Sequence, residues 1–579
     1  MGAAVKFSFV LITALSCSTW IYFLHYSVSI NRDGDADNIG LQHNVPTPRC
    51  DCQKTSSSRP TPSIRSSQSS ETFNNVSQIL KALDPKEKWE WPVMDAVYTW
   101  VDGSKPKWLA EKEKYRVQFF AALENKTKEQ IKEEDKIAGL DQGPNQANRF
   151  MDHHELKYSF RSIVKHAPWI RNIYLLTADG EGPEWLDPSH PRITVLSHAD
   201  IFKNQDHLPT FSSRPIEASL VNIPGISENF LYFNDDMFFG LPVEQSDWIP
   251  DPTTGSQNVF LDYWRFPDCN EGCKYEMQGD GQCNVECNNA ACNWDFGDCG
   301  LNATALGRKE YEEELRRQRA NYTRNDGFFK QANMYTDGFF NRELGKSEVS
   351  NKRRGPIAHL PYLINKRLYR DILERFREEY AKTLTHRFRH VEDFQLSFTY
   401  YHYYAFQQVY APTKKMIWRA ALLTTKNKEP FLYGSNFDAT NKYQLGRRHF
   451  IESTESFHTL QECSKTILET RTLSPNRIAE CEEAADKLYS EYPLRLPIPY
   501  LSVIDFKKDK NAGMYYFLRI VDGRKVKKWK RRLEEPRKEP RKFVCLEDML
   551  LNGSSPEIEA KYLETFTALF PDPSPFEKK

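Results

Sequence analysis

The chain has 579 residues, with 79 basic and 79 acidic side chains and no formal net charge. Hydrophobic residues make up 39% of it and charged residues 27%, a balance that permits a sizeable folded core and excludes a wholly disordered protein. The even charge balance argues against a general nucleic-acid-binding protein. The mean hydropathy of -0.67 excludes a polytopic membrane protein but permits a single anchor.

The amino-terminal segment has the pattern of a membrane anchor followed by a stem. Residues 7–30 form one apolar run, with Lys6 before it and no acidic residue until Asp33. A run of this length spans a bilayer core of about 30 Å. We therefore predict a cytosolic tail at 1–6, a transmembrane signal anchor at 7–30 and a lumenal remainder; a cleaved signal peptide is the alternative. Residues 31–92 are polar and rich in Ser, Thr and Pro, which predicts a flexible stem.

Structure is expected to begin near Trp91, where short apolar runs of buried-strand type start to alternate with helical segments. The expected strands are 95–101, 172–177, 192–196 and 229–233, and the expected helices are 109–137, 155–166, 215–221, 368–380 and 391–406. Strands that alternate with helices in this way predict a mainly parallel α/β sheet. The predicted main domain has two parts, 93–266 and 302–579, separated by a cysteine-rich insert at 267–301.

Six of the twelve cysteines fall between Cys269 and Cys299, in a segment with few apolar residues. A module of about 30 residues without an apolar core needs disulfides and often a metal ion. Disulfides also indicate an oxidising, lumenal compartment. The oxygen-bearing side chains of the module suit Ca²⁺ better than Zn²⁺, and they are Asp280, Asn284, Asp295 and Asp298. A disulfide knot without metal is the alternative.

The spacing of these six cysteines resembles that of a Lin12/Notch repeat. The resemblance implies one Ca²⁺, held largely by Asp295 and Asp298. It also implies three disulfides, which are Cys269–Cys292, Cys273–Cys287 and Cys283–Cys299. Outside the module we predict a local pair, Cys463–Cys481. Cys50 and Cys52 lie in the stem, where they would cross-link two chains, and the odd lumenal total leaves one thiol outside any intramolecular pair.

Acidic residues follow two of the predicted strands, at the sheet edge where α/β proteins bind ligands. Asp235 and Asp236 come directly after the fourth predicted strand, and Asp102 follows the first. Adjacent carboxylates repel each other, so we expect a divalent cation, Mg²⁺ or Mn²⁺, beside Asp235 and Asp236. Trp100 offers an aromatic surface on which a nucleotide base stacks. The alternatives are solvated loop acids, a turn at Asp102 and a core position for Trp100.

Two further residues have side chains suited to phosphate chemistry. His359 is a candidate base near neutral pH. Arg389 is able to grip a phosphate group in a bidentate way. A purely structural role is the alternative for each.

Four blocks of the sequence resemble the Stealth family of sugar-1-phosphate transferases, and most closely its members that transfer N-acetylglucosamine 1-phosphate. The blocks are 95–103, 148–236, 358–395 and 541–546. The resemblance implies a Rossmann-like, glycosyltransferase-like α/β catalytic domain of mainly parallel sheet, interrupted by the Notch-type repeat.

The resemblance also assigns roles to single residues. Asp235 and Asp236 match the family's acidic pair, while His359 and Arg389 match its functional histidine and arginine. We expect His359 to act as the base, with Asp236 as its rival, and Arg389 to clamp a phosphate. The residues expected to bind substrate are Trp100, Asp102, Arg161, Ser213, Glu217 and Asp235.

The expected reaction is the attack of a mannose hydroxyl on the sugar-bearing phosphorus of a UDP-sugar, most simply UDP-GlcNAc, with release of UMP. This is expected as the first step of mannose 6-phosphate tagging of glycoproteins. The enzyme is expected in the Golgi membrane, with a lumenal catalytic domain, as a homodimer that binds no nucleic acid. The alternatives are another donor such as UDP-xylose, a metal-dependent glycosyltransferase that releases UDP, and a surface binding protein built around its Notch-type repeat.

Overall fold

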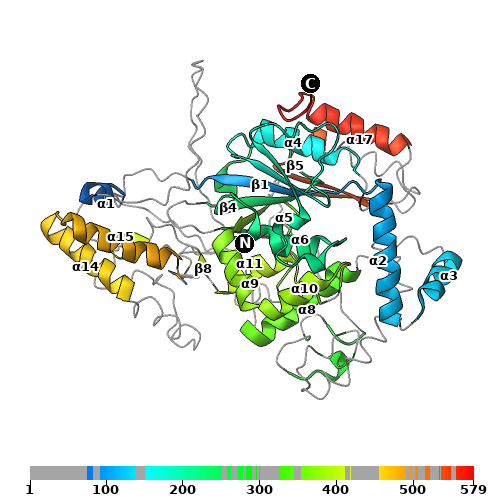
Figure 1. Ribbon diagram of the computed structural model, residues 1–579, viewed down its shortest axis with the longest axis horizontal. Coiled ribbons are helices and arrows are strands. Elements are labelled where there is room, and N and C mark those ends of the chain that lie inside the picture. Colours follow the sequence, from blue (N-terminus) through cyan, green and yellow to red (C-terminus); the bar gives the residue numbers. More distant parts are fainter. Residues whose placement is uncertain are drawn as a thin grey trace, which may run out of the picture. The chain divides into compact units, whose positions relative to one another are not determined.

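The computed structural model describes much of the chain from residue 75 onward (Figure 1). The described residues are 75–82, 91–124, 126–138, 150, 152–250, 257–262, 271–274, 277, 282–289, 292, 295, 299, 327–344, 354–390, 392–407, 409–410, 417–418, 421, 455–490, 496–497, 502–505, 515–521, 534, 536–549 and 556–578. The predicted tail, the predicted membrane anchor, Cys50 and Cys52 lie outside them. Among the helices described, none combines the length and the apolar character that a membrane crossing requires.

The central sheet has five strands in the order β3-β2-β1-β4-β7. They are β1 Met94–Thr99, β2 Ile173–Thr177, β3 Ile193–Ser197, β4 Asn229–Asn234 and β7 Tyr362–Asn365. β1 to β4 are mutually parallel, and β7 lies antiparallel to β4 at the edge. The four parallel strands match the predicted strands to within two residues at each end. The predicted mainly parallel, Rossmann-like α/β fold is therefore confirmed. Its inner strands are nearly continuous apolar runs because both faces of the sheet are covered.

Helix α4, Glu155–His166, has the bounds that its sequence pattern predicts. Its apolar side chains Leu156, Phe160 and Ile163 recur every three or four residues, which gives the helix one buried face. Phe160 packs on Tyr98 of β1 with ring centroids 5.0 Å apart, so α4 covers one face of the central sheet.

Other helices complete this part of the chain. They are α5 His198–Ile201, α6 Ser213–Ser219, α8 Gly327–Leu344, α9 Lys366–Arg375, α10 Arg377–Thr385 and α11 Leu396–Gln407, with 3₁₀ turns at Gln205–His207, Leu220–Asn222 and Gln245–Asp247. The single helix predicted over 368–380 is two helices, α9 and α10, which meet at Phe376. The segment predicted helical over 109–137 is likewise two, α2 Pro106–Glu124 and α3 Lys128–Ala138.

The predicted flexible stem, 31–92, contains one helix, α1 Val76–Ala82. Val76 and Ile79 are three residues apart on this helix and are both buried in the main apolar core. The prediction of a flexible segment was wrong over α1, because two apolar residues on one helical face are enough to pack against the core.

A second, three-stranded sheet forms from distant parts of the chain. It has β11 Tyr515–Val521 parallel to β12 Phe543–Met549, and β12 antiparallel to β5 Met237–Phe239. Two short pairs accompany it, β6 Asn258–Leu261 with β10 Ser502–Asp505, and β8 Val409–Tyr410 with β9 Leu496–Pro497. Since β5 directly follows β4, this sheet brings a segment more than 300 residues later in the chain to the end of the central sheet.

The carboxyl-terminal helix α17, Pro556–Leu569, packs along α4 (Figure 1). The Tyr158 hydroxyl of α4 is hydrogen bonded to the Thr567 hydroxyl of α17 at 2.9 Å. Phe566 stacks on Tyr158, with ring centroids 5.1 Å apart. The last segment of the described chain is therefore part of the folded domain.

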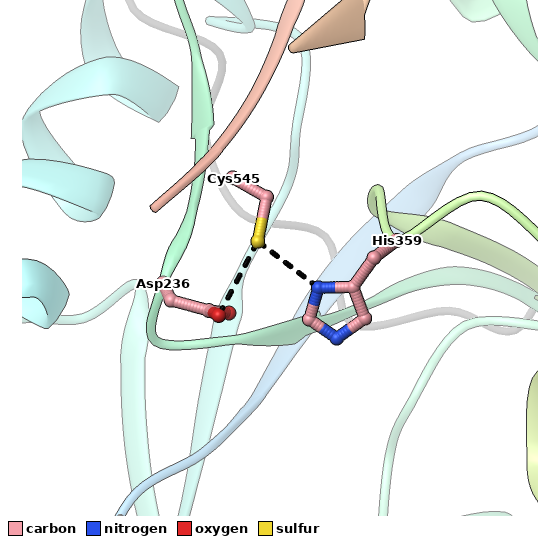
Figure 2. A group of neighbouring side chains, drawn as sticks. All are labelled: Asp236, His359 and Cys545. Carbon is pink, nitrogen blue, oxygen red and sulfur yellow. Dashed lines mark hydrogen bonds between the residues drawn. The ribbon is translucent and has the colours of Figure 1, made fainter. Parts of the chain in front are cut away.

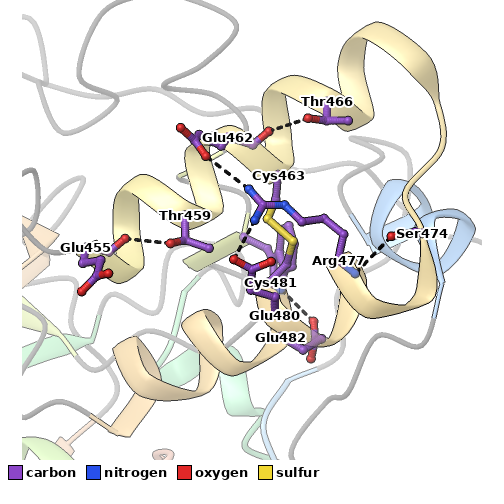
Figure 3. The surroundings of a disulfide bond; sticks show 11 residues. Glu455, Thr459, Glu462, Cys463, Thr466, Ser474, Arg477, Glu480, Cys481 and Glu482 are labelled. Carbon is purple, nitrogen blue, oxygen red and sulfur yellow. Dashed lines mark hydrogen bonds and ion pairs between the residues drawn. A yellow bond between two sulfur atoms is a disulfide. The ribbon is translucent and has the colours of Figure 1, made fainter.

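Three of the four predicted disulfides are present. Cys273–Cys287 and Cys283–Cys299 confirm two pairs of the Notch-type module, and Cys463–Cys481 confirms the local pair. Cys292 is also disulfide bonded, but its predicted partner Cys269 lies outside the described residues. Cys463 and Cys481 join the antiparallel hairpin of α14 Glu455–Thr470 and α15 Pro475–Ser490 (Figure 3).

The Notch-type module contains a 3₁₀ turn, Val285–Cys287, next to two of the predicted Ca²⁺ ligands. The Asp295 carboxylate is fully buried, and its Oδ2 accepts the Asn284 backbone N–H at 2.6 Å. Asp280 and Asp298 lie outside the described residues. A buried carboxylate beside Asn284 is compatible with the predicted Ca²⁺ site, which stays a prediction.

Candidate active site

The acidic and aromatic residues predicted at a ligand site follow two neighbouring strands. β1 and β4 run parallel, and Thr99 pairs with Asn234 at their carboxyl ends. The strand order reverses between β1 and β4, and open α/β sheets bind ligands in the crevice outside the strand ends at such a point. Trp100 follows β1 and Asp235 follows β4, so both lie at this edge of the sheet.

The loop after β1 is tightly constrained. Trp100 is 8% exposed within the apolar core, and its indole N–H has no hydrogen-bond partner among the described residues. Asp102 Oδ1 accepts the Ser104 backbone N–H at 3.0 Å and the Ser104 hydroxyl at 2.5 Å. The geometry is thus that of the alternative interpretations, a core tryptophan and an Asp turn, and the substrate-binding roles of Trp100 and Asp102 stay predictions.

Three side chains from distant parts of the sequence meet beside the end of β4 (Figure 2). His359 Nδ1 lies 3.0 Å from Cys545 Sγ, and this thiol donates to Asp236 Oδ2 at 3.3 Å. On the other side of the imidazole, Nε2 lies 3.0 Å from Asn234 Nδ2. Cys545 is fully buried, whereas His359 and Asp236 are half-buried. The structure therefore brings the predicted catalytic residues His359 and Asp236 together, with Cys545 between them.

Backbone pairing positions this cluster. β12 lies antiparallel to β5, and the Leu546 N–H donates to the carbonyl oxygen of Asp236 at 3.0 Å. The backbone N–H of His359 donates to the hydroxyl of Tyr515 on β11, also at 3.0 Å. Because β11 and β12 are paired, one sheet holds Cys545 and anchors the segments that carry Asp236 and His359.

Asp235 belongs to a group of neighbouring carboxylates. Burial raises the pKa of Asp235 well above its ordinary value, and the charges of Asp236 and Asp152 raise it further. Burial has the same effect on the pKa of Glu155, the first residue of α4, with added contributions from Asp152 and Asp235. Poorly solvated carboxylates repel one another when they are ionised. A bound divalent cation would offset this repulsion.

Among the described residues, one group of side chains brings its ligand atoms close enough to hold a cation, and the neighbouring acids are a second source of donor atoms. Asp152, Glu155 and Asp235 offer only oxygen atoms, which fit the predicted Mg²⁺ or Mn²⁺. Among the described residues, Asp236, His359 and Cys545 form a group whose ligand atoms all lie within 4.8 Å of one another. That group mixes oxygen, nitrogen and sulfur, which suits Zn²⁺ better than Mg²⁺.

The segment that carries Arg389 is fixed by a buried ion pair. Arg214 of α6 donates to Asp393 Oδ2 at 3.1 Å and to the carbonyl oxygen of His390 at 3.2 Å. His386 Nδ1 lies 2.7 Å from the other Asp393 oxygen. Burial alone would raise the pKa of Asp393, but the hydrogen bond from His386 and the charge of Arg214 hold it below its ordinary value. An ionised Asp393 therefore ties the Arg389 segment to α6.

The same contact brings together three residues predicted at the site. Ser213 begins α6, and Glu217 lies one turn later with its Oε2 accepting the Leu396 N–H of α11 at 3.4 Å. Glu217 is buried, while Ser213 and Arg389 are half-buried. Ser213 and Glu217 lie on α6, and Arg389 lies on the segment that the Arg214–Asp393 ion pair holds against it. Their roles toward the substrate stay predictions.

Comparison with known proteins finds matches along this whole arrangement. Stealth protein conserved regions 1, 2, 3 and 4 match residues 92–118, 149–256, 358–406 and 535–579, and the LNR domain matches 266–300. The four regions occur in their numbered order, with the LNR domain between the second and the third. The chain is therefore similar to Stealth proteins over all four of their conserved regions.

Each Stealth region contributes residues at or near the carboxyl ends of β1 and β4. Region 1 contains Trp100, region 2 contains Asp235 and Asp236, region 3 contains His359, and region 4 contains Cys545. Regions that are far apart in the sequence are thus folded around one place. The hairpin of α14 and α15 lies outside all four regions.

Curated relatives of this chain are phosphotransferases by name. N-acetylglucosamine-1-phosphotransferase subunits alpha/beta of Homo sapiens are 47% identical over 157 residues, which cover 27% of this chain and 12% of the relative. An exopolysaccharide phosphotransferase of Streptomyces coelicolor is 41% identical over 156 residues, 27% of this chain and 23% of that protein. The receptor polysaccharide phosphotransferase WefC of Streptococcus oralis is 36% identical over 171 residues, 29% of this chain and 45% of that protein. The chain therefore spans less than half the length of each of these relatives.

Arg161 lies away from the strand ends, on the face of α4 that packs against the carboxyl-terminal segment. Its Nε and Nη2 atoms each lie 2.7 Å from a carboxylate oxygen of Glu577, and Nη1 donates to the carbonyl oxygen of Phe570 at 3.0 Å. This guanidinium is engaged in holding the carboxyl terminus. Its predicted role in substrate binding gains no support from these contacts.

Sequence reasoning did not assign four residues of the site a role. Asp152 and Glu155 lie inside the second Stealth block. Neither directly follows a predicted strand, which was the signal that selected Asp235 and Asp236. Asn234 was taken as the end of a strand. For Cys545 two signals existed, its position in the fourth block and the odd number of lumenal cysteines.

Proposed function

We propose that the chain transfers a sugar 1-phosphate from a nucleotide sugar to a hydroxyl acceptor and releases a nucleoside monophosphate. The observation that carries the proposal is the meeting of Asp236, Cys545 and His359 at the end of β4, where residues of three Stealth regions are in contact. The phosphotransferase names of the relatives support the same reaction class.

The chemistry divides among these residues as follows. The acceptor hydroxyl attacks the sugar-bearing phosphorus, its proton passes to a base, and the bond to the oxygen bridging to the nucleoside phosphate breaks. His359 Nε2 is the proposed base, and Asp236 is the alternative. Arg389 is the proposed clamp for a phosphate oxygen. The leaving nucleoside monophosphate needs no proton at neutral pH.

A cation would be held by the carboxylates of Asp152, Glu155 and Asp235, whose oxygen donors fit Mg²⁺ or Mn²⁺. Bound there, it would neutralise charge on the phosphates. When they are ionised and no cation is bound, these carboxylates repel a diphosphate.

The substrates are proposed at a finer level from the likeness to the human relative, whose printed name specifies N-acetylglucosamine 1-phosphate. On this proposal the donor is UDP-GlcNAc, and the acceptor is a mannose hydroxyl of a glycoprotein. The enzyme would be a type II Golgi membrane protein and a homodimer, with Ca²⁺ in its Notch-type module. The names of the bacterial relatives favour a second acceptor class, a polysaccharide hydroxyl.

The test is the identity of the released nucleotide. The purified full chain is incubated with UDP-GlcNAc, Mg²⁺ or Mn²⁺ and α-methyl mannoside, and nucleotides are separated by chromatography. Acceptor-dependent UMP is expected; UDP would establish glycosyl transfer instead. UDP-xylose is the second donor in the same assay.

A variant of the base makes the test specific to the site. His359→Ala is expected to lower kcat at least about 100-fold, the usual contribution of a general base. Lys165→Ala is the control, because Lys165 lies on α4 and donates to the carbonyl oxygen of Leu569, away from the strand ends. Equal activity of the two variants would remove His359 from the mechanism.

A further inference from the structure

Cys545 occupies the centre of the cluster that contains both candidate bases. We infer that Cys545 is a positioning residue of the transferase site, whose thiol fixes the proton arrangement of His359 and the orientation of Asp236. The inference rests on the proposed function and adds to it a residue that acts through its neighbours. It depends on the contacts of one fully buried sulfur atom with two side chains.

The contacts define one consistent set of donors and acceptors. Asn234 Nδ2 only donates, so His359 Nε2, at 3.0 Å from it, is an acceptor and carries no proton. The proton of the neutral imidazole is then on Nδ1, which donates to Cys545 Sγ. The thiol in turn donates its own hydrogen to the carboxylate of Asp236. Each step of the sequence Asn234, His359, Cys545, Asp236 thus has one donor and one acceptor.

The opposite arrangement fails at the sulfur. If Nε2 carried the proton, Nδ1 would be an acceptor, and the thiol hydrogen would be needed by His359 and by Asp236 at once. One hydrogen cannot serve both, and a sulfur lone pair would then face a carboxyl oxygen of Asp236 at 3.3 Å. The thiol between them therefore favours the tautomer whose Nε2 carries no proton. That nitrogen accepts from Asn234 Nδ2 here, so a substrate hydroxyl must replace the Asn234 amide at Nε2 for His359 to act as the base.

The alternative explanation of a buried cysteine is packing alone, because cysteine is among the most buried residue types. Packing would require only apolar contact around Sγ. Here the sulfur lies within hydrogen-bond distance of an imidazole and a carboxylate, and β12 holds it there by its pairing with β5. The arrangement is that of a base whose second nitrogen is held by an orienting group.

Two substitutions separate positioning from packing. Cys545→Ser keeps a group that donates and accepts, whereas Cys545→Ala removes it at similar size. Cys545→Ala is expected to lower kcat about 10- to 100-fold with KM changed less than about threefold, the usual cost of losing an orienting contact. Cys545→Ser is expected to recover most of that loss.

Ser159→Ala is the matched control. Ser159 is fully buried, and its hydroxyl donates to the carbonyl oxygen of Met237, the β5 residue that pairs with Cys545. Ser159→Ala therefore removes a hydrogen bond to the same strand, β5, and leaves the contacts of the His359 imidazole in place. A kcat loss in Ser159→Ala equal to that in Cys545→Ala would overturn the inference, and so would an unchanged kcat in Cys545→Ala.

A measurement on the resting protein distinguishes failure of the inference from failure of the proposed function. Long-range ¹H–¹⁵N correlation spectra of histidine-labelled protein report which ring nitrogen carries the proton, and the His359 signal is assigned by its loss in His359→Gln. A proton on Nδ1 supports the inference even if the wild-type chain releases no UMP, and a proton on Nε2 overturns it. Metal analysis of the same sample covers the remaining case: about one zinc ion per chain, lost in Cys545→Ala, would make the sulfur a metal ligand and also overturn the inference.

Discussion

At the scale of single residues, two carboxylates have opposite electrostatic surroundings. One lies at the carboxyl ends of the central strands and the other near the carboxyl terminus. Asp235 is half-buried beside other acids, whereas Glu577 is half-buried in an ion pair with Arg161. The first arrangement lowers stability at neutral pH and is retained only where a ligand gains from it. The second stabilises the fold. Each predicts a different response to pH and to a charge-removing substitution.

Asp235→Asn is expected to stabilise the chain at neutral pH in the absence of divalent cations. Because the pKa of Asp235 is raised in the folded state, its contribution to stability is present below its ordinary pKa and is lost as pH rises through the raised value. The variant has no such charge, so its Tm at pH 7 in EDTA should be higher, with the difference vanishing near pH 4. Added Mg²⁺ or Mn²⁺ should raise the wild-type Tm more than that of the variant. Differential scanning fluorimetry makes the comparison, and a lower Tm in the variant would refute the electrostatic account.

Glu577→Gln is expected to do the opposite. Burial raises the pKa of Glu577, but the hydrogen bonds from Arg161 and from the Ser574 N–H outweigh burial and bring the pKa to about 2. Its stabilisation is therefore present above its ordinary pKa and is lost as pH falls toward 2. We expect the variant to lose about 2 kcal/mol at pH 7, the size of one charge-assisted hydrogen bond, and clearly less near pH 2.5, where only part of the stabilisation remains. Urea unfolding at both pH values measures this; an equal loss at the two pH values would contradict it.

At the scale of elements, the loop after β1 is held by close backbone contact. A Cβ on Gly103 would overlap the carbonyl oxygen of Phe150, and the Gly103 N–H donates to that same oxygen at 2.8 Å. A side chain here must displace the backbone that leads into α4. Gly103 therefore has no tolerance for substitution, although its sequence context, an Asp-Gly turn, shows only that a turn is present.

Gly103→Ala should consequently damage both stability and transfer. We expect a Tm lower by several degrees and a kcat reduced about 10-fold or more, because Trp100 and Asp102 move with the loop. Gly355→Ala is the control, since a Cβ at Gly355 meets no atom within 4 Å. Tm and UMP release are measured for both variants. Equal values in Gly103→Ala and Gly355→Ala would mean that the backbone at Phe150 moves aside at little energetic cost.

The elements were predictable from sequence to the extent that their signals are local. The parallel strands are continuous apolar runs closed by polar residues, and α4 shows a clear helical period, so each was found close to its true bounds. β12 was not found, because no turn or charge pattern marks a strand that pairs with partners far away in the chain. α1 was hidden by the composition of the stem around it.

At the scale of the whole molecule, the candidate site depends on contacts between regions hundreds of residues apart. His359 and Asp236 were selected from sequence by residue type and family resemblance, and the structure places them on either side of one thiol. The sequence marked Cys545 as a cysteine of the fourth block, but its contacts with His359 and Asp236 were beyond sequence reasoning for a physical reason. Its role depends on the register of β12 against β5, and nothing local in the sequence specifies that register.

The α14–α15 hairpin makes a last prediction at this scale, since it lies between the third and fourth Stealth regions. Its Cys463–Cys481 disulfide closes a separation of 18 residues (Figure 3), and closing a loop of this size stabilises a fold by about 3 kcal/mol in the chain-entropy account. Cys463 and Cys481 are both fully buried among residues of the main core. The double variant Cys463→Ala with Cys481→Ala should therefore have a Tm lower by several degrees.

Transfer chemistry should survive the same double variant. The residues proposed to bind and activate substrate lie in the four Stealth regions, and the hairpin lies outside them, so UMP release at 25 °C is expected within about twofold of wild type. Glu482 of α15 accepts the Trp418 indole N–H at 2.9 Å, which attaches the hairpin to the chain just after α11 by a contact that the disulfide does not supply. Trp418→Phe is the comparison variant, because it breaks that contact and keeps the disulfide. A loss of kcat in the double variant but not in Trp418→Phe would show that the disulfide-linked hairpin shapes the active site, and the division of the chain into a conserved transferase and an accessory hairpin would then be wrong.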